Sequence, residues 1–310
     1  YNFLKNKIKK KLIFVNNLNS NATYFKDKNI NLNLIISKSG NTLETITNAS
    51  ALIKDKDNNI IITEDKNNYL KDLAIKLKAE VFEHKNYVGG RYSVLSEVGM
   101  LPAELMKLNE NRFKQFNNLI VNKIFIKNLV NNVAATLNFI KTGKSNSIIL
   151  NYDEQSESLF KWYQQLIAES LGKKSKGILP VISSMPKDNH SLMQLYLDGP
   201  KNAFYTFFNV LDNNDIKVNN KNILNSKNFL KNKSVEQIKQ SQMLATEKIF
   251  RIKKIPFRSF KILKRNEKTI GELFCFFILE TILLGRALDV NPFDQPSVEL
   301  IKQETKKILI

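Results

Sequence analysis

The sequence is poor in cysteine and histidine and has no long apolar run. Its single cysteine, Cys275, cannot form an intramolecular disulfide, so we expect a reducing compartment, namely the cytoplasm. No apolar stretch reaches the roughly 18 residues that a membrane span needs, which argues against a membrane partner. Histidine, cysteine and aspartate are not clustered at the spacing of metal ligands, so no metal site is predicted.

The charge of the chain is strongly positive. There are 48 Lys and Arg residues against 29 Asp and Glu residues, which leaves a net charge of +19 and favours anionic partners. The lysines are scattered through asparagine-rich stretches such as 5–11 and 219–233, and no basic run is interleaved with aromatic residues as in proteins that bind single strands. We therefore expect a solvated basic surface, a phosphorylated metabolite as ligand, and no specific nucleic acid.

The hydrophobic pattern predicts the fold class. At 310 residues the chain suits about two domains of roughly 150 residues each. Short β-branched runs alternate with stretches in which apolar residues recur every three or four positions, as in strands that pair in parallel through helical crossovers. This cycle starts again after Leu108, so we place a domain boundary near 108–112. The prediction is an α/β fold of two doubly wound layers, which places a ligand beyond the carboxyl ends of the strands.

The expected elements are as follows. Strands are predicted at 12–15, 32–37, 60–63, 81–83, 147–151, 177–183, 203–210 and 256–263. Helices are predicted at 42–53, 69–78, 123–141, 155–171, 190–197, 235–250, 267–287 and 298–309.

The segment Ser37–Thr42 lies between a predicted strand and a predicted helix. Free N–H groups at a helix N-terminus attract an anion, Gly40 allows close approach of the backbone, and three hydroxyl groups can donate hydrogen bonds. Serine and threonine are also ordinary capping residues, so a simple capped helix start is the alternative. The segment is a candidate phosphate-binding loop.

A second candidate loop is Val88–Ser93. The adjacent Gly89 and Gly90 expose backbone N–H groups, and Arg91 follows them directly. A structural arginine paired with a carboxylate explains Arg91 equally well when this segment is taken by itself.

Together these segments resemble the signatures of the glucose-6-phosphate isomerase family. The resemblance extends to 162–173, 188–191 and 291–302, and the five segments come in the expected order. It implies two sugar-isomerase (SIS) domains of doubly wound type, at 1–110 and 111–290, and a C-terminal helical arm at 291–310 that completes the active site. It also implies an aldose-ketose isomerase of glycolysis and gluconeogenesis that converts glucose 6-phosphate and fructose 6-phosphate without a cofactor.

The resemblance assigns the phosphate loop and the proton-transfer residues. The residues implied to hold the sugar phosphate are Ser37, Lys38, Ser39 and Thr42. Glu169 is implied to be the base that moves a proton between C2 and C1 through a cis-enediol. Arg91 would stabilise the enediolate, with help from the backbone of Gly90.

The remaining assignments concern ring opening and orientation of the sugar. His190 would move the proton between the ring oxygen and the anomeric hydroxyl, with Lys302 nearby, and Gln165 and Gln295 would bind the substrate. In the family the ring-opening histidine comes from the partner subunit, so a homodimer is implied. Taken singly, a glutamate late in a helix, a lysine on a terminal helix or a histidine in a loop is usually a plain surface residue.

The chain departs from the family pattern at three points. A Gly-Ile-Gly-Gly-Ser type of loop precedes the phosphate loop in the family, and nothing like it occurs before Ser37. Ser297 stands where the family has glycine, and Pro296 follows Gln295. The chain also opens at Tyr1 rather than methionine, and we expect that it begins partway into the family sequence and lacks the first strand.

Two other functions fit the same residues. One is an isomerase that also accepts mannose 6-phosphate, which differs at C2 and would use the same base. The other is a non-catalytic SIS module that binds a sugar phosphate. A module of that kind needs the phosphate loop but not Glu169, His190, Arg91 and Lys302 together, which favours the enzyme.

Overall fold

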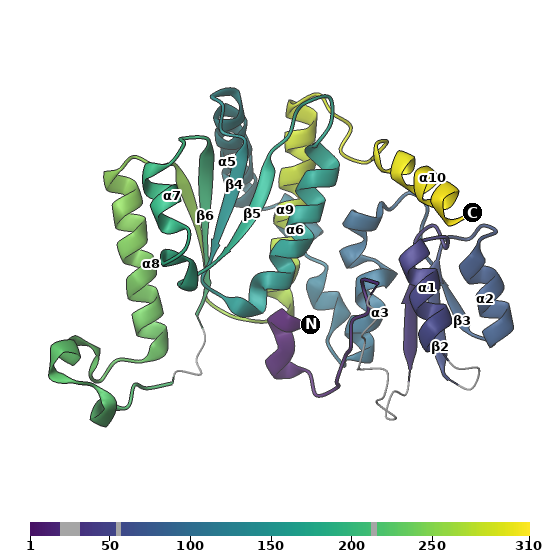
Figure 1. The fold of residues 1–310 in the computed structure, drawn as a ribbon, viewed down its shortest axis with the longest axis horizontal. Helices are drawn as coiled ribbons and strands as arrows, with labels where there is room; N and C mark the ends of the chain where they lie inside the picture. Colours follow the sequence, from purple (N-terminus) through teal and green to yellow (C-terminus); the bar gives the residue numbers. More distant parts are fainter. Residues whose placement is uncertain (19–31, 54–56, 212–215) are drawn as a thin grey trace. The chain divides into compact units, whose positions relative to one another are not determined.

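The computed structural model describes residues 1–18, 32–53, 57–211 and 216–310. The chain forms two compact units (Figure 1): the N-terminal unit comprises Tyr1 and Asn6–Asn111, and the C-terminal unit comprises Asn2–Lys5 and Arg112–Ile310. Both units are built on parallel β-sheets flanked by helices, which confirms the predicted α/β class.

The N-terminal unit contains a sheet in the order β1-β2-β3. Its strands are β1 (Asn33–Ile36), β2 (Asn59–Thr63) and β3 (Glu80–Glu83), all parallel. Its helices are η1 (Asn2–Lys7, shared with the other unit), α1 (Leu43–Leu52), α2 (Tyr69–Leu77), η3 (Gly90–Leu95), α3 (Glu97–Leu105) and η4 (Glu110–Phe113, at the boundary).

The core of this unit lies between the sheet and its helices. Ile35 of β1 and Ile61 of β2 pack with Ala49 of α1 and with Leu70 and Ala74 of α2. Ile61 and Leu70 are fully buried. The alternation of crossover helix and strand places the carboxyl ends of all three strands at one edge of the sheet, because the strands are parallel.

The C-terminal unit contains a four-stranded parallel sheet in the order β5-β4-β6-β7. Its strands are β4 (Asn146–Asn151), β5 (Leu179–Ser184), β6 (Ala203–Val210) and β7 (Phe257–Ile262). Its α-helices are α4 (Phe116–Ile120), α5 (Lys123–Lys141), α6 (Glu157–Leu171), α7 (Met193–Asp198), α8 (Val235–Ile252), α9 (Glu267–Ala287) and α10 (Val298–Leu309). Short 3-10 turns are η5 (Glu154–Ser156), η6 (Lys187–Asn189), η7 (Asn220–Asn222) and η8 (Asn225–Leu230).

Strand β6 is buried on both faces, as expected of a central parallel strand. Phe207 packs on Phe250 of α8, with ring centroids 5.3 Å apart, while Phe208 packs on Phe160 of α6 at 4.8 Å. Helices α7 and α8 therefore cover one face of the sheet, and α6 and α9 cover the other (Figure 1). The two central strands, β4 and β6, are therefore buried.

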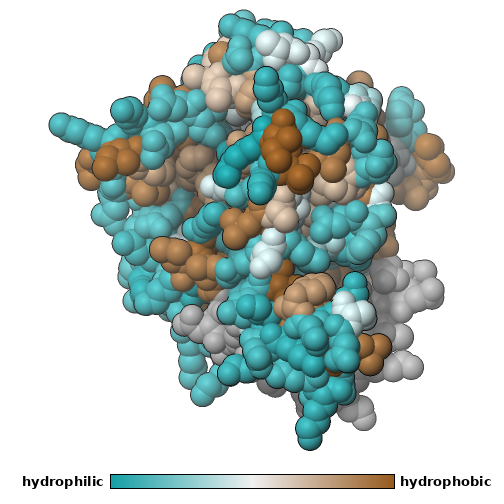
Figure 2. All heavy atoms as spheres, turned by 90° about the vertical axis from the view of Figure 1, so that its left-hand side faces the viewer, coloured by the Kyte–Doolittle hydropathy of each residue, from teal (hydrophilic) through white to brown (hydrophobic). Residues whose placement is uncertain are grey.

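The lysine- and asparagine-rich segment 219–233 lies mostly exposed to solvent, as its composition predicts. Figure 2 shows the side of the C-terminal unit that carries this segment, where hydrophilic side chains cover most of the surface and the hydrophobic patches are small and separate.

One predicted strand is wrong. Residues 12–15 have no regular structure, and Phe14 is 60% exposed, with its ring against Tyr1 at 5.8 Å. In the part of the chain that the structure describes, no strand pairs with this run, since β1 pairs with β2 alone. A short apolar run becomes a strand only where a neighbour supplies backbone hydrogen bonds.

Candidate active site

The candidate phosphate loop connects β1 to α1. The hydroxyl groups of Ser37 and Thr42 lie 2.7 Å apart across the loop. Thr42 is the N-cap residue of α1, yet its side chain makes no capping bond to the helix. The side chain that would ordinarily cap α1 is thus turned toward Ser37, which leaves the first-turn N–H groups of α1 accessible to an anion.

Gly40 allows the loop to pack against the start of α2. Its φ is +66°, and its carbonyl accepts a hydrogen bond from the N–H of Leu70 at 3.2 Å. A β-carbon at this position would lie 1.9 Å from Oδ1 of Asn68, the N-cap residue of α2. Both the backbone conformation and the close contact require glycine here.

Lys38 links the loop to the carboxyl ends of the next two strands. Its ammonium group donates to the carbonyl of Asn86 at 3.0 Å and lies 3.5 Å from the carboxylate of Glu64. Burial by itself would raise the pKa of Glu64, but hydrogen bonds and charges from Lys66 and Lys38 outweigh it and lower that pKa. Glu64 is therefore ionised and holds Lys38 in place.

Arg91 lies in η3, which follows β3. It is buried, and its guanidinium carbon is 5.3 Å from the centroid of the Tyr92 ring. The Ser93 hydroxyl donates to the carbonyl of Gly90 at 2.7 Å, which fixes the turn. Because β1, β2 and β3 are parallel, the two candidate loops and Glu64 lie along one edge of this sheet.

Helix α6 of the C-terminal unit carries Gln165, which is exposed, and Glu169, which is half-buried. Its buried apolar residues recur every three or four positions, as in a helix that packs one face on a core. The amide nitrogen of Gln165 donates to Oε1 of Glu169 at 2.9 Å. The structure thus brings together the predicted base and a predicted substrate-binding amide.

His190 lies in a turn between β5 and α7 that Asp188 organises. The Asp188 carboxylate accepts hydrogen bonds from the hydroxyl of Ser183 at 2.9 Å, the N–H of Ser184 at 2.7 Å and the hydroxyl of Ser191 at 2.9 Å. Burial by itself would raise the pKa of Asp188, and these three hydrogen bonds lower it below its ordinary value. The His190 side chain is exposed.

Gln295 and Lys302 belong to the C-terminal segment and are exposed. Gln295 follows a turn at Asn291–Asp294, and Lys302 is on α10. The side chain of Lys173, four residues after Glu169, contacts the carbonyl groups of Asn291 and Asp294.

The predicted residues are divided between the two units. The N-terminal unit holds Ser37, Lys38, Ser39, Thr42, Gly90 and Arg91. The C-terminal unit holds Gln165, Glu169, His190, Gln295 and Lys302. Three residues contact a predicted site residue or the turn next to one, yet were given no role from the sequence: Glu64, Lys173 and Asp188. Each had a signal in the sequence: Glu64 follows a predicted strand directly, and Lys173 and Asp188 lie in the segments 162–173 and 188–191 that resemble the family.

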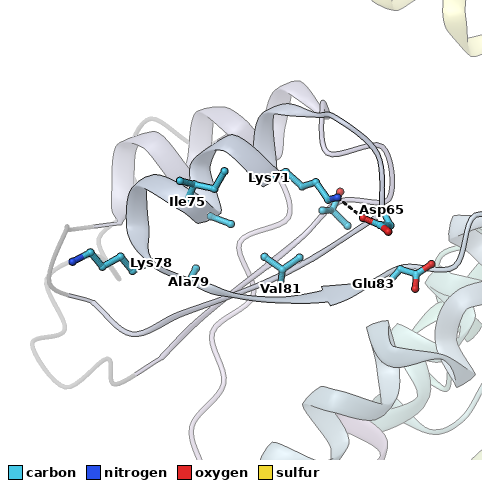
Figure 3. A pocket seen from close by; sticks show the side chains of 9 residues that line it. Asp65, Lys71, Ile75, Lys78, Ala79, Val81 and Glu83 are labelled. Atoms are coloured by element: carbon cyan, nitrogen blue, oxygen red, sulfur yellow. Dashed lines mark hydrogen bonds and ion pairs between the residues drawn. The ribbon is translucent and has the colours of Figure 1, made fainter.

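A pocket of about 690 Å³ lies in the N-terminal unit between α2 and β3 (Figure 3). Ile75 and Val81 line it, and at one end Lys71 and Asp65 form an ion pair. Its lining residues include none of the predicted site residues, and we do not assign the substrate to it.

These features define the class of the protein, an α/β protein with parallel sheets whose polar loops follow the strands. Among the residues described, no helix is long and apolar enough to cross a membrane. The profile of the Phosphoglucose isomerase family matches residues 2–310. The chain belongs to this family, which confirms the resemblance seen in its sequence motifs.

Individual relatives agree with this assignment. The chain is 32% identical to the glucose-6-phosphate isomerase of Methanocaldococcus jannaschii, over 95% of this chain and 76% of the relative. It is 33% identical to that of Mycoplasmopsis pulmonis, over 92% of this chain and 71% of the relative. A hypothetical protein of Thermus thermophilus shares the fold, with a TM-score of 0.80, 24% identity, and coverage of 89% of this chain and 71% of that chain.

Proposed function

We propose that this chain is a glucose-6-phosphate isomerase that interconverts glucose 6-phosphate and fructose 6-phosphate. The observation that carries the proposal is the match to the Phosphoglucose isomerase family over residues 2–310, which includes every residue that the mechanism needs. The geometry within each unit supports it, since the candidate phosphate loop lies in one unit and a carboxylate that accepts a hydrogen bond from an amide lies in the other.

The proposed mechanism has two chemical stages. The phosphate binds at 37–42, where hydroxyl groups and helix N–H groups favour an anion. His190 then moves a proton between the ring oxygen and the anomeric hydroxyl, with Lys302 nearby, and opens the ring. Glu169 next removes the proton on C2 and returns it to C1, while the proton of the C2 hydroxyl passes to the C1 oxygen and the carbonyl moves to C2; Arg91 stabilises the enediolate oxygen.

The surroundings of these residues suit their roles. Arg91 is 4% exposed, so water screens its charge little and a developing enediolate gains more from it than from an exposed arginine. Gln165 fixes the Glu169 carboxylate, and both Gln165 and Gln295 have amides that can bind sugar hydroxyl groups.

We extend the proposal to the organisation of the protein. Residues 1–110 and 111–290 would be its two SIS domains, and residues 291–310 would complete the active site. The exposed His190 fits a homodimer in which this side chain acts in the site of the partner. The enzyme would work in the cytoplasm.

The test is direct. Purified protein is incubated with glucose 6-phosphate, and fructose 6-phosphate formation is followed, with mannose 6-phosphate as a parallel substrate. Formation of fructose 6-phosphate from glucose 6-phosphate supports the proposal, and turnover of both substrates indicates a dual isomerase. A folded protein that binds glucose 6-phosphate without converting it would instead be a sugar-phosphate-binding module.

A further inference from the structure

Lys173 is the first residue after the C-cap of α6 and makes a dense set of polar contacts. Its ammonium group contacts the carbonyl of Asn291, lies 2.5 Å from the carbonyl of Asp294 and forms an ion pair with the Asp294 carboxylate at 2.6 Å. The Lys173 side chain is only 11% exposed. Lysine is seldom buried to this degree, and here all its contacts go to one turn, Asn291–Asp294.

The loop that contains Lys173 makes further contacts with the end of α9. Lys176 donates to the carbonyl of Leu288 at 2.7 Å, and Lys174 to that of Asp289 at 3.4 Å. Cations are favourable at a helix C-terminus, where carbonyl groups lack helical partners. Lys174 and Ser175 have φ of +52° and +57°. Non-glycine residues seldom adopt this conformation, so the contacts come at a conformational cost.

The turn that Lys173 contacts is itself well defined. The Asn291 side chain donates to the carboxylate of Asp294 at 3.1 Å and accepts from the N–H of Phe293 at 3.1 Å. Pro292 packs on Gly285 of α9, where an added β-carbon would lie 2.9 Å from the proline ring. Because these contacts fix the turn, they also fix the point from which the following residues extend.

We propose that Lys173 is a positioning residue that fastens the C-terminal arm to the end of the helix that carries Glu169. It sets where the chain enters the arm, and so governs the placement of Gln295 and of α10 with Lys302. The role of the arm in catalysis rests on the proposed function, whereas the fastening itself does not. Lys173 acts through the turn and takes no direct part in proton transfer.

The first experiment measures the fastening without any assay of activity. Lys173→Met keeps the aliphatic stem and removes the ammonium group, and Lys161→Met, at an exposed lysine earlier in α6, is the matched control. Amide hydrogen exchange over residues 291–310 should become at least about tenfold faster in Lys173→Met and stay within about twofold in Lys161→Met. Unchanged exchange in a folded Lys173→Met protein overturns the proposal.

The second experiment asks whether the fastening serves catalysis. We expect Lys173→Met to lower kcat/KM at least about tenfold in the wild-type background and less than about twofold in a Lys302→Met background, because both changes act through the same arm. An equal loss in both backgrounds would reduce Lys173 to a structural residue and overturn the positioning role.

A second variant tests the proposal if Lys173→Met fails to fold. Asp294→Asn removes the charge that Lys173 pairs with and leaves the backbone carbonyls in place. Its loss of kcat/KM should be smaller than that of Lys173→Met, and it should likewise shrink in the Lys302→Met background. If the wild-type protein shows no isomerase activity at all, the proposed function fails, and hydrogen exchange still decides whether Lys173 fastens the arm.

Discussion

Gln165 donates a hydrogen bond of 2.9 Å to the carboxylate of Glu169, one turn further along α6. Gln165 is exposed, and Glu169 is half-buried. A base that serves two neighbouring carbons must keep its oxygen within reach of both, and a fixed carboxylate satisfies this better than a freely rotating one. The pair is therefore the place to begin mutational work.

Glu169→Gln should lower kcat at least about a hundredfold and leave KM nearly unchanged, because the amide cannot accept the proton while substrate contacts persist. Steady-state kinetics with glucose 6-phosphate measures this. Glu157→Gln is the matched control, since Glu157 is an exposed glutamate at the start of the same helix. A Glu169→Gln enzyme as fast as the control would rule out Glu169 as the base.

Gly40→Ala should destabilise the protein by about 1–3 kcal/mol, because alanine is strained at a φ of +66° and its β-carbon would collide with Asn68. Gly143→Ala separates the two effects, since Gly143 has a φ of +83° with no atom within 4 Å of the added carbon. Thermal unfolding should show a larger loss for Gly40→Ala. Equal losses would mean that the contact with Asn68 does not matter.

The sequence predicted the fold well where long, regular patterns were present. The predicted bounds of β6, α9 and α10 are those observed, because buried strands and amphipathic helices of this length are determined largely by local pattern. Residues 12–15 show the limit. Their apolar run has a strand-like composition, but whether it forms a strand depends on a neighbouring strand, and composition carries no information about neighbours.

In the candidate site, too, some features follow from the local sequence and others depend on distant parts of the chain. The loop at 37–42 was predictable, because a serine- and glycine-rich turn between strand and helix is a local signal. The long-range contacts of the site residues were not predictable from the sequence. Lys38 meets Glu64 across 26 residues and Lys173 meets Asp294 across 121, and such pairs exist only once the chain has folded. Sequence motifs therefore point to the candidate site residues, and the structure adds the residues that contact them.

Asp188 should stabilise the turn that carries His190 in a way that depends on pH. Because its pKa is lowered in the folded protein, its contribution is present above the ordinary value of 3.8 and is lost as the pH falls through the lowered pKa. Asp188→Asn should therefore cost about 1 kcal/mol at pH 7, and the difference from wild type should shrink as the pH falls below 3.8. Thermal unfolding at several pH values measures it.

Asp188→Ala extends this comparison. Asparagine can still accept from Ser183 and Ser184 while its amide donates to Ser191, whereas alanine removes all three bonds. We expect a loss of about 2–3 kcal/mol for alanine, together with a lower kcat, because the turn no longer holds His190. A difference between wild type and Asp188→Asn that stays constant from pH 7 to pH 3 would contradict the role of the charge.

The proposed homodimer makes a prediction about mixed subunits. His190→Asn and Glu169→Gln should each abolish most activity. If each site takes Glu169 from one chain and His190 from the other, a mixed dimer of the two variants contains one site with both residues intact and one with neither. Random pairing of equal amounts makes about half of the dimers mixed, so activity should recover to about a quarter of wild type.

Co-expression or joint refolding of the two variants provides the mixed dimers, and light scattering measures the size of the assembly. Joint refolding of each variant with itself is the control, and it should remain inactive. If Glu169 and His190 act within one chain, every site in a mixed dimer keeps one defect and no activity returns. Recovery near a quarter therefore supports a shared site, and its absence in a confirmed mixed dimer rejects one.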